Sequence, residues 1–578
     1  MQMSNTQIAK LLKGIAASYT IKKSGNIFEI RAYENAADSI EHLTSEVKDL
    51  WDEGKLGEVP GLGTKLQSYL DELFKTGQVK HFEAVKAGIP EVVFDLLDVP
   101  GVGPKTAQEL VRLEVKDLED LKKKIKSGQL VSKGFSSKIS QKIMQGLREI
   151  AGRQGRMLLP YAFAQAARIV QYLKKSKFVY EVHPLGSLRR MVATVGDLDF
   201  SVSSDNSAKV VDYFCKMQGV TRIIDQGEHK ATVTLQSGMQ ADLLVGKPGS
   251  YGALLQHFTG SKAHNIHLRT LAEKKGLTLS EYTQAETEEE FYKLMGMQTP
   301  PPELREDLGE IEASLAGKLP DLVELKDIKG DLHTHSNFPF PNPSHGPGAD
   351  SIEDIVKKSK QLGYEFIGIS DHPPGHSSVS KEEMIKAIEK RTKFIQSLRN
   401  EYNTPNLNTK SVRILNGLEI DILMDGSLSV PDEALATLDY CIAGIHSGHR
   451  GLKETITKRL MGALSNPHVD IVSHPTNRLL NERESSEADW EEIFKYAAKN
   501  NKLLEINGYP NRLDLRDDLV REAKKCGVKF VINTDAHGAS QMDNMLFGVS
   551  VARRGWAEKE DIVNSWDWTD FAKWFNID

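Results

Sequence analysis

Seven short apolar segments in the second half of the chain constrain its fold more than any other feature. Longer stretches of helical character separate them, and each segment ends in a side chain that can bind a metal ion or a polar substrate group. Because strands that alternate with helices favour a parallel sheet, the pattern predicts a parallel barrel, whose chemistry gathers at the strand ends. The segments are residues 330–335, 366–372, 413–419, 441–446, 471–474, 503–507 and 530–537.

Histidine and acidic residues occupy most of these terminal positions. The first segment carries His333 and His335, and the last carries Asp535 and His537. A single His after a strand is more often a structural, hydrogen-bonded residue than a ligand. Six segments that end in His or Glu, on strands whose ends should meet, instead predict a metal cluster.

A second carboxylate pattern lies nearer the middle of the chain. Residues 195–202 read as a strand on which Asp197 and Asp199 share one face. Two adjacent carboxylates repel each other unless cations lie between them. A later strand supplies Asp242. An isolated Asp-x-Asp is usually a solvated edge, but here the turn at 186–190, Gly-Ser followed by two arginines, precedes it and suits a triphosphate. The combination predicts a two-metal phosphoryl-transfer site.

The first 150 residues read as helices interrupted at Gly and Pro, and one interruption occurs twice. Residues 59–65 and 99–105 share the helix-hairpin-helix pattern Val-Pro-Gly-x-Gly-x-Lys, and residues 134–138 resemble a degenerate third copy. Such glycines allow a tight turn that presents amide groups to a phosphate at a helix N-terminus. A single copy is usually just a turn, whereas two copies predict contact with the DNA backbone. The expected contacts are Gly61, Gly63, Lys65, Gly101, Gly103 and Lys105.

The charge distribution also differs between the first and second halves of the chain. The net charge of −6 alone would argue against a nucleic acid partner, but residues 121–190 hold 16 Lys and Arg against 2 acidic residues. Residues 331–578 hold 30 against 37. The first half of the chain can therefore bind a polyanion, while the second half can bind cations. Taken alone, the lysine triplet 122–124 fits a solvated helix face equally well.

The block around the Asp-x-Asp resembles the nucleotidyltransferase palm of family X DNA polymerases. The likeness rests on residues 186–187, 196–199, 242, 258–261 and 276–282 and extends over most of residues 1–300. It implies that Asp197 and Asp199 bind two Mg²⁺ or Mn²⁺ ions and that Asp242 binds the catalytic one. The nucleotide contacts that it implies are Gly186, Ser187, Arg190, Phe258, Gly260, Asn265 and Arg269.

Two residues depart from that family's pattern. His257 stands where the family usually has a Tyr beside the Phe, which leaves sugar discrimination open. Tyr69 stands where the eukaryotic repair members carry a Schiff-base lysine, so that residue should supply no deoxyribose-phosphate lyase chemistry.

The second half resembles the polymerase-and-histidinol-phosphatase (PHP) domain, above all in Asp-Leu-His-Thr-His at 331–335. The resemblance implies a distorted seven-stranded barrel with two or three Mn, Zn or Fe ions, which suit imidazole and carboxylate ligands. The implied ligands are His333, His335, His372, Glu419, His446, His474, Asp535 and His537. A Pro-rich insertion, residues 338–347, occupies the remaining ligand position, and His345 is the candidate there. Asn507 and Arg512 are candidates for a phosphate contact or for surface roles.

Together these features predict a multidomain chain that joins a helical region, an α+β palm and an α/β barrel of the (β/α)7 type. The predicted parts are an N-terminal helical DNA-binding domain with the first hairpin (1–88), fingers with the second hairpin (89–155), a nucleotidyltransferase palm (156–248), a thumb (249–297), a linker (298–328) and the PHP barrel (329–578).

The leading functional hypothesis is a template-directed, gap-filling repair polymerase fused to a 3′–5′ exonuclease, with cleavage at abasic sites left open. A nuclease or small-phosphate phosphatase whose front half only docks DNA is the alternative, and the three palm carboxylates argue against it. A non-catalytic DNA scaffold would require broken metal sites. Expected partners are DNA and deoxynucleoside triphosphates. No apolar run approaches the ~20 residues of a membrane span, and without a secretory signal or paired cysteines we expect a cytoplasmic monomer.

Overall fold

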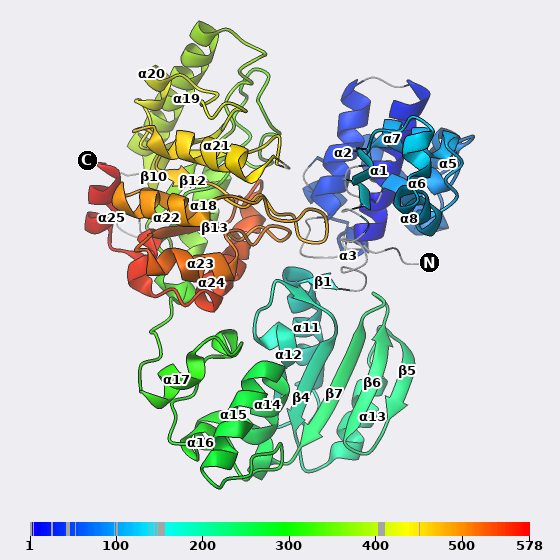
Figure 1. The fold of residues 1–578 in the computed structure, drawn as a ribbon, viewed down its shortest axis with the longest axis vertical. Helices are drawn as coiled ribbons and strands as arrows, with labels where there is room; N and C mark the ends of the chain where they lie inside the picture. Colours follow the sequence, from blue (N-terminus) through cyan, green and yellow to red (C-terminus); the bar gives the residue numbers. More distant parts are fainter. Residues whose placement is uncertain are drawn as a thin grey trace. The chain divides into compact units, whose positions relative to one another are not determined.

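The computed structural model describes residues 3, 5–24, 27–41, 47–52, 54–59, 61–97, 99, 102–137, 139–141, 143–144, 147, 156–402, 411–449 and 451–577. It divides into two compact units, each described by itself (Figure 1). The N-terminal unit is Met1–Arg156 with two short segments, Gln236–Gly238 and Asn481–Arg483. The C-terminal unit is the rest. Within the described chain, no helix has the length and apolar character that a bilayer crossing requires.

The described residues of the N-terminal unit form helices packed around two apolar cores. The first core lies among α1, α2, α4 and α5, and the second among the helices from α6 onward. The helices are α1 (Asn5–Lys22), α2 (Ile27–Glu41), α3 (Val47–Asp52), α4 (Thr64–Thr76), α5 (Lys80–Lys86), α6 (Val92–Leu97), α7 (Pro104–Arg112), α8 (Leu118–Lys126) and α9 (Gln129–Ser132), with a 3-10 turn, η1, at Leu56–Glu58.

The described residues of the two Gly-x-Gly repeats make the same backbone hydrogen bond, whereas Pro60, Pro100 and Gly101 lie outside them. In the first, the amide of Leu62 donates to the carbonyl of Val59, and in the second the amide of Val102 donates to that of Val99. All four of these apolar side chains are buried. Each turn delivers the chain into a helix, α4 or α7, whose N-cap is a glycine. The described residues of both copies therefore agree with the predicted helix-hairpin-helix pattern.

The first part of the C-terminal unit, in sequence order, contains a five-stranded sheet in the order β2-β4-β7-β6-β5. Figure 1 shows β4, β7, β6 and β5 side by side. Its strands are β2 (Glu181–Pro184), β4 (Leu198–Ser203), β5 (Val220–Gln226), β6 (Lys230–Leu235) and β7 (Gln240–Gly246); β1 (Met157–Leu158) and β3 (Thr194–Val195) form a separate pair. Helices α11 (Leu159–Leu173), α12 (Gly186–Arg189) and α13 (Ser207–Cys215) belong to this palm-like part. Alternate residues of β6 and β7 are buried, as a half-buried strand requires.

Short helices follow the sheet: α14 (Tyr251–Thr259), α15 (Lys262–Lys274), α16 (Glu288–Lys293), α17 (Glu310–Leu315) and the 3-10 turn η3 (Pro302–Leu304). A buried ion-pair network ties them to the palm. Glu288 accepts from Arg189 at 2.5 Å and from Arg305 at 2.5 Å. Burial alone would raise the pKa of Glu288, but the two guanidinium groups lower it to about 2. This carboxylate is therefore ionised at neutral pH and holds the two segments together.

The predicted barrel is confirmed as seven parallel strands in the order β14-β13-β12-β11-β10-β9-β8. They are β8 (Gly330–Asp331), β9 (Phe366–Ile369), β10 (Arg413–Asp421), β11 (Tyr440–Gly444), β12 (Ile471–Val472), β13 (Leu503–Asn507) and β14 (Phe530–Asn533). A parallel bridge between Thr334 and Ala536 nearly closes the sheet between its first and last strands. The helices are α18 (Ile352–Leu362), α19 (Lys381–Tyr402), α20 (Asp432–Leu435), α21 (Lys453–Ser465), α22 (Trp490–Lys499), α23 (Asp517–Lys525), α24 (Met545–Arg554) and α25 (Trp568–Phe575).

One buried aromatic side chain, Tyr440, packs closely against two neighbouring strands of the barrel. Tyr440 donates its hydroxyl to the carbonyl of Leu332 at 2.5 Å. A Cβ atom would lie 2.2 Å from its hydroxyl oxygen at Gly368 and 2.2 Å from its ring Cζ at Gly417, so both positions require glycine. Beyond it, Phe571 of α25 stacks on Phe366 at 4.1 Å. Apolar side chains thus pack at the amino ends of the strands. Polar side chains lie at the opposite, carboxyl ends.

Candidate metal centres

The three palm carboxylates meet at one edge of the five-stranded sheet. Asp199 on β4 and Asp242 on the parallel neighbour β7 are direct register partners. The predicted strand 195–202 begins only at Leu198, so Asp197 lies in the bend that precedes it. Ligand oxygens of the three carboxylates nevertheless lie within 4.8 Å of one another.

This grouping is electrostatically unfavourable without a counter-charge. Burial and the charges of Asp197 and Asp242 raise the pKa of Asp199 to about 7. Asp242 is held by Thr232 and by Gln240, whose side-chain amide donates at 2.7 Å. Divalent cations would relieve the repulsion, so the donor set fits the predicted metal pair.

Gly186 is required beside these carboxylates for two reasons. Its φ of +57° lies in the left-handed region that other residues rarely adopt. A Cβ atom there would also lie 2.7 Å from Oδ2 of Asp199. The glycine therefore allows the α12 turn, with Ser187, to approach the carboxylate cluster closely.

Other predicted nucleotide contacts already make internal bonds. Arg190 donates to Glu306 at 3.0 Å and to the carbonyl of Thr259 at 2.5 Å. Gly260 follows α14 with a φ of +71°, and the preceding Phe258 packs edge-to-face against His257.

The two predicted minor-groove residues, Asn265 and Arg269, both contact the residue that departs from the family pattern. Asn265 donates to the backbone carbonyl of His257 at 2.7 Å, and a guanidinium nitrogen of Arg269 lies 2.6 Å from its ring Nδ1. The imidazole is thus part of this polar group.

The structure brings all the predicted barrel ligands together at the carboxyl ends of the strands, with Glu419 at their centre. Its Oε1 lies 3.0 Å from His474 and 3.2 Å from His446. Its Oε2 lies 3.1, 3.3 and 3.5 Å from the Nε2 atoms of His333, His372 and His335. A carboxylate whose two oxygens face separate groups of imidazoles is placed to bridge metal ions.

Asp535 and His537 complete the cluster on its other side. Asp535 Oδ1 lies 3.3 Å from Nε2 of His335. The ring of His537 stacks on that of His335 at 4.1 Å. Burial alone would raise the pKa of Asp535, yet the neighbouring histidines hold it well below its usual range.

Several buried ring nitrogens in this cluster make no hydrogen bond within the described chain. They are Nε2 of His333, both nitrogens of His335, and Nδ1 of His372 and of His474. Leaving a buried polar nitrogen without a partner costs roughly 1–3 kcal/mol. A metal ion would use such lone pairs, so the cluster fits the metals that the sequence predicts.

His345, the candidate for the remaining ligand position, lies at the edge of this cluster. Its Nε2 is 2.9 Å from Oδ1 of Asp421, and the same oxygen lies 2.7 Å from Nδ1 of His446. The three residues form a further group whose ligand atoms lie within 4.8 Å of one another. Asp421, at the end of β10, was not among the predicted ligands.

Sequence reasoning also missed the role of Glu505 on β13. Glu505 is fully buried and lies 2.6 Å from Nδ1 of His333. It also accepts from the backbone amide of His474 at 2.8 Å and from the side-chain amide of Asn533 at 2.9 Å. A carboxylate on Nδ1 fixes the ring so that Nε2 faces the metal.

The two phosphate-contact candidates have different surroundings. Asn507 is fully buried, and its amide donates to Glu505 at 3.0 Å and to Asp535 at 3.2 Å. The surface role considered for Asn507 is therefore wrong, because the residue is buried at the end of β13, and its contact with a phosphate stays a prediction. Arg512 is partly exposed, with Nε 3.5 Å from Asp535, and remains a candidate.

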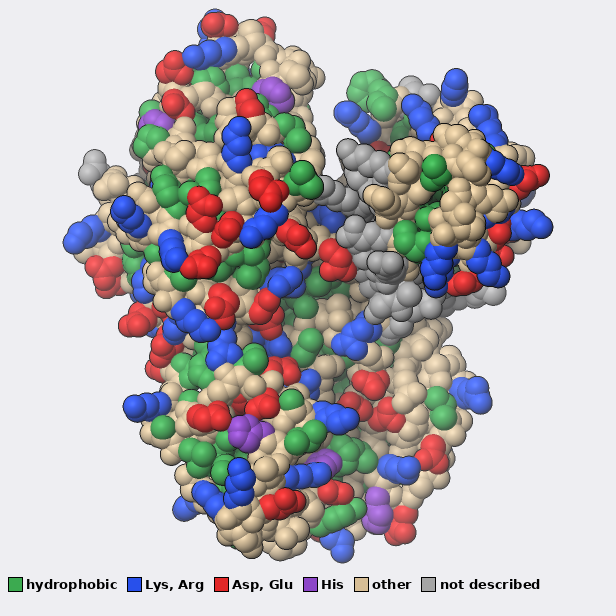
Figure 2. Space-filling model, in the orientation of Figure 1, with side chains coloured by type: hydrophobic (Ala, Val, Ile, Leu, Met, Phe, Trp, Pro, Cys, Tyr) green, Lys and Arg blue, Asp and Glu red, His purple; other side chains and the backbone are tan. Residues whose placement is uncertain are grey.

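In the N-terminal unit, the hairpin positions that the structure describes are exposed. Gly61, Gly63 and Lys65 are exposed in the first hairpin and Gly103 and Lys105 in the second, whereas Gly101 lies outside the described residues. Lys and Arg side chains are spread over the visible face of this unit (Figure 2).

Tyr69, where a lysine nucleophile would stand, packs as an aromatic residue. Its ring stacks on His81 at 4.9 Å, and Nε2 of His81 lies 3.0 Å from the hydroxyl of Tyr19.

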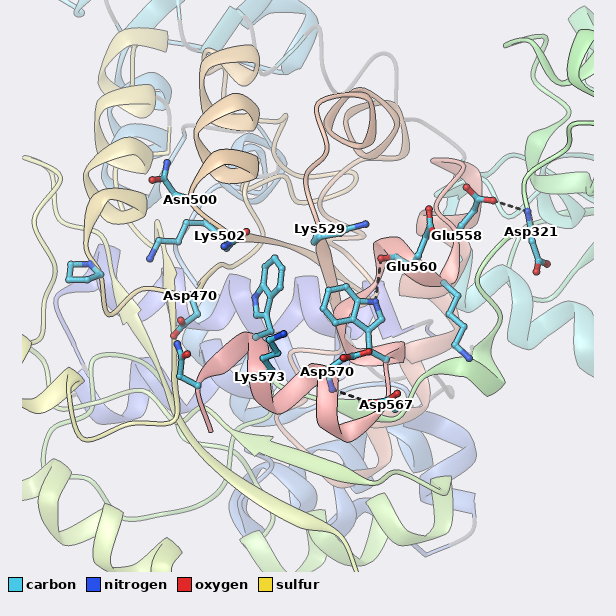
Figure 3. Close-up of a pocket in the computed structure, with 16 residues that line it drawn as sticks. Asp321, Asp470, Asn500, Lys502, Lys529, Glu558, Glu560, Asp567, Asp570 and Lys573 are labelled. Atoms are coloured by element: carbon cyan, nitrogen blue, oxygen red, sulfur yellow. Dashed lines mark hydrogen bonds between the residues drawn. The ribbon is translucent and has the colours of Figure 1, made fainter. Parts of the chain in front are cut away.

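A cavity of about 1070 Å³ lies away from both clusters (Figure 3). Asp470, Lys502 and Lys529, which line it, precede the barrel strands β12, β13 and β14. It therefore opens at the amino ends of the strands, and none of the candidate metal ligands lines it.

Comparison with known proteins gives evidence on the family of the chain that does not depend on the geometry of the sites. Four family models match the chain: a helix-hairpin-helix domain at residues 3–79, a SAM-like helix-hairpin-helix tandem at 93–149, the DNA polymerase beta thumb at 254–306 and the PHP domain at 331–508.

The chain is 34% identical over 577 residues to a protein of Bacillus subtilis named DNA polymerase/3′-5′ exonuclease PolX, an alignment covering 97% of this chain and 98% of that protein. Probable phosphatases of Clostridium acetobutylicum and Acetivibrio thermocellus are each 27% identical over 216 residues, which is 36% of this chain and 78% of each relative.

Proposed function

The chain belongs to the family X DNA polymerases that carry a C-terminal PHP domain, and we propose that it extends DNA primers at the palm and degrades DNA 3′–5′ at the barrel. One observation carries the proposal: two separate metal-ligand clusters, one on the palm sheet and one at the barrel strand ends, each built from its own part of the fold.

At the palm, three carboxylates and a glycine turn would position the metal ions and the incoming nucleotide. Asp197 and Asp199 would hold both Mg²⁺ or Mn²⁺ ions, and Asp242 would hold the ion nearest the primer 3′ hydroxyl. Such ions supply Lewis acidity that favours the attacking oxygen and stabilises the leaving one. Ser187 and Arg190 bind the triphosphate of the incoming deoxynucleotide.

Further palm residues place the rest of the nucleotide. Gly186 lets the binding turn approach Asp199, and Phe258 and Gly260 line the sugar. Asn265 and Arg269 face the minor groove of the new base pair. His257, in contact with both, replaces the family's tyrosine, so sugar selection in this chain involves an imidazole.

At the barrel, the His and carboxylate cluster would hold two or three Mn²⁺, Zn²⁺ or Fe ions that activate water for phosphodiester hydrolysis. Glu419 bridges the two groups of imidazoles, and Glu505 and Asp421 orient His333 and His446. Arg512 is placed to contact a phosphate of the substrate. His345 serves as the ligand supplied by the Pro-rich insertion.

Several finer points belong to the same proposal. DNA is held through backbone phosphates by the two hairpins, at Gly61, Gly63 and Lys65 and at Gly101, Gly103 and Lys105. The enzyme acts as a monomer on gapped DNA in repair. Cleavage at abasic sites is a second candidate activity of the barrel, since the same phosphodiester hydrolysis would serve it.

Primer extension and primer degradation on a gapped duplex test this proposal. Asp242→Ala should lose extension and retain degradation, whereas His335→Ala should lose degradation and retain extension. Asp225→Ala, at an exposed carboxylate on β5, and His376→Ala, at an exposed histidine, are the matched controls and should keep both activities. Hydrolysis of a small phosphate ester without DNA degradation by the unaltered protein would favour a phosphatase instead.

A further inference from the structure

An arginine of the barrel reaches the polymerase residue that binds the triphosphate. Arg554, the last residue of α24, donates Nη1 to the backbone carbonyl of Arg190 at 2.8 Å. The same nitrogen donates to Glu306 at 3.0 Å, and Nε donates to Asp517 of α23 at 2.7 Å. Only 11% of the Arg554 side chain is exposed.

Glu306 is shared between two guanidinium groups. Its Oε1 accepts from Nε of Arg190 at 3.0 Å and from Arg554 at 3.0 Å. The two guanidinium groups thus face two carboxylates, Glu306 and Asp517, and Glu306 divides its charge between Arg190 and Arg554. Without Arg554 the whole carboxylate charge would fall on Arg190, and at such short range it would oppose a triphosphate.

Neighbouring contacts join the same parts without touching Arg190. Arg553 donates to Glu303 at 2.7 Å and to the carbonyl of Val323 at 3.1 Å. Arg521 donates to the carbonyl of Leu308. The barrel therefore contacts the segment 303–308 at several points, and Arg554 alone among these arginines is bonded to Arg190.

We infer that Arg554 is a positioning residue for the polymerase site: it holds the turn that carries Arg190 and shares the charge of Glu306, so that the barrel sets the affinity of the palm for deoxynucleoside triphosphates. The inference rests on the proposed function, because it assigns Arg190 to the triphosphate. It makes the second domain a part of the nucleotide-binding apparatus, separate from its own hydrolytic cluster.

Steady-state extension on gapped DNA with the full-length protein tests the inference. Arg554→Ala should raise KM for the deoxynucleotide about fivefold to tenfold while kcat changes less than about twofold, since the partners of Arg554 do not include Asp197, Asp199 or Asp242. Arg553→Ala, one position away on the same helix, should leave KM unchanged. Degradation rates and Tm of both variants should report an intact barrel.

A second substitution separates charge sharing from loosened packing. In the Arg554→Ala background, Glu306→Gln removes the carboxylate charge and should return KM most of the way to its original value. Unchanged KM in Arg554→Ala, or an equal rise in Arg553→Ala, would overturn the inference. A KM that Glu306→Gln fails to lower would overturn its charge-sharing part. No extension by the unaltered protein would overturn the proposed function and this inference with it.

Discussion

Glu505 shows how much a single residue can matter without being a ligand. Its carboxylate contacts Nδ1 of His333 and, through two further hydrogen bonds, fixes neighbouring parts of the cluster. Glu505→Gln keeps the shape but loses the negative charge that orients the imidazole. We expect metal affinity at the barrel to fall about 10- to 100-fold. Metal content after dialysis against a graded chelator measures this.

The matched control for that prediction is Glu491→Gln, at an exposed glutamate of α22. It should leave metal content and degradation unchanged. Polymerisation should persist in both variants, because the palm carboxylates belong to another sheet. Full metal retention by Glu505→Gln would remove the orienting role from this residue.

Asp470 gives a pH-dependent prediction away from both clusters. Its side chain lines the cavity of Figure 3 and accepts from the amide of Cys441 at 2.8 Å. Burial raises its pKa to about 7. In the unfolded chain the pKa is about 3.9, so between these values the folded state binds the extra proton and stability falls as pH rises.

Asp470→Asn removes this titration and keeps an acceptor for Cys441. Between pH 5 and pH 8 its Tm should therefore rise relative to that of the unaltered protein, by an amount corresponding to at most about 3 kcal/mol. Asp225→Asn, at an exposed carboxylate, should show no such pH-dependent gain. A constant difference in Tm across this pH range would show that the folded-state pKa is not raised.

At the residue scale, the sequence predicted the palm carboxylates and the barrel ligands because each stands in a recognisable local run. Glu505 and Asp421 were missed as site residues for a physical reason. Each acts on a histidine from a different segment, and that contact exists only after the strands have been laid side by side. The hydrogen bond from the Asn507 amide to Asp535 could not be predicted from the sequence for the same reason.

At the scale of elements, the two hairpins make the clearest prediction. Gly63 and Gly103 have ordinary φ values, and a Cβ atom at either would meet nothing within 4 Å. Replacing both with Ala should therefore leave Tm nearly unchanged. It should weaken DNA binding several-fold, because the added methyl groups lie where a phosphate must approach the helix N-termini.

DNA affinity should also fall steeply with salt and show little sequence preference, since phosphate contacts release counterions. Gly57→Ala, whose Cβ would have its nearest neighbours at 3.9 Å, is the control in the same unit and should bind DNA normally. Equal affinities for the double variant and the unaltered protein, measured by anisotropy over a salt series, would exclude the hairpins as the phosphate contacts.

The strands themselves were predictable in number and order but less so in length. The first predicted segment, 330–335, forms a strand only at Gly330–Asp331. Its later residues bend toward the cluster, where Thr334 bridges to Ala536. Conversely β10 continues to Asp421, whose carboxylate is bonded to two histidines. Apolar periodicity does not encode these contacts, so it could not predict where β8 and β10 end.

At the scale of the whole molecule, the predicted palm, thumb, linker and barrel fall within one compact unit, except for Gln236–Gly238 and Asn481–Arg483. The predicted boundaries at 248, 297 and 328 remain predictions. Contacts such as Arg553 to Glu303 and Arg554 to Glu306 cross the predicted linker. Deleting the chain from Asp331 onward would remove the arginine partners of Glu303 and Glu306. Point substitutions are therefore the better way to separate the activities.

The central claim is that one chain holds two separate metal-dependent sites acting on DNA. The most direct measurement follows extension and degradation of a single labelled primer in a gapped duplex, with Asp197→Ala, Asp535→Ala and the double variant compared at matched metal and folded content. We predict loss of extension alone, loss of degradation alone, and loss of both. If Asp197→Ala and Asp535→Ala, each folded, abolish the same single activity, the two-site account is contradicted.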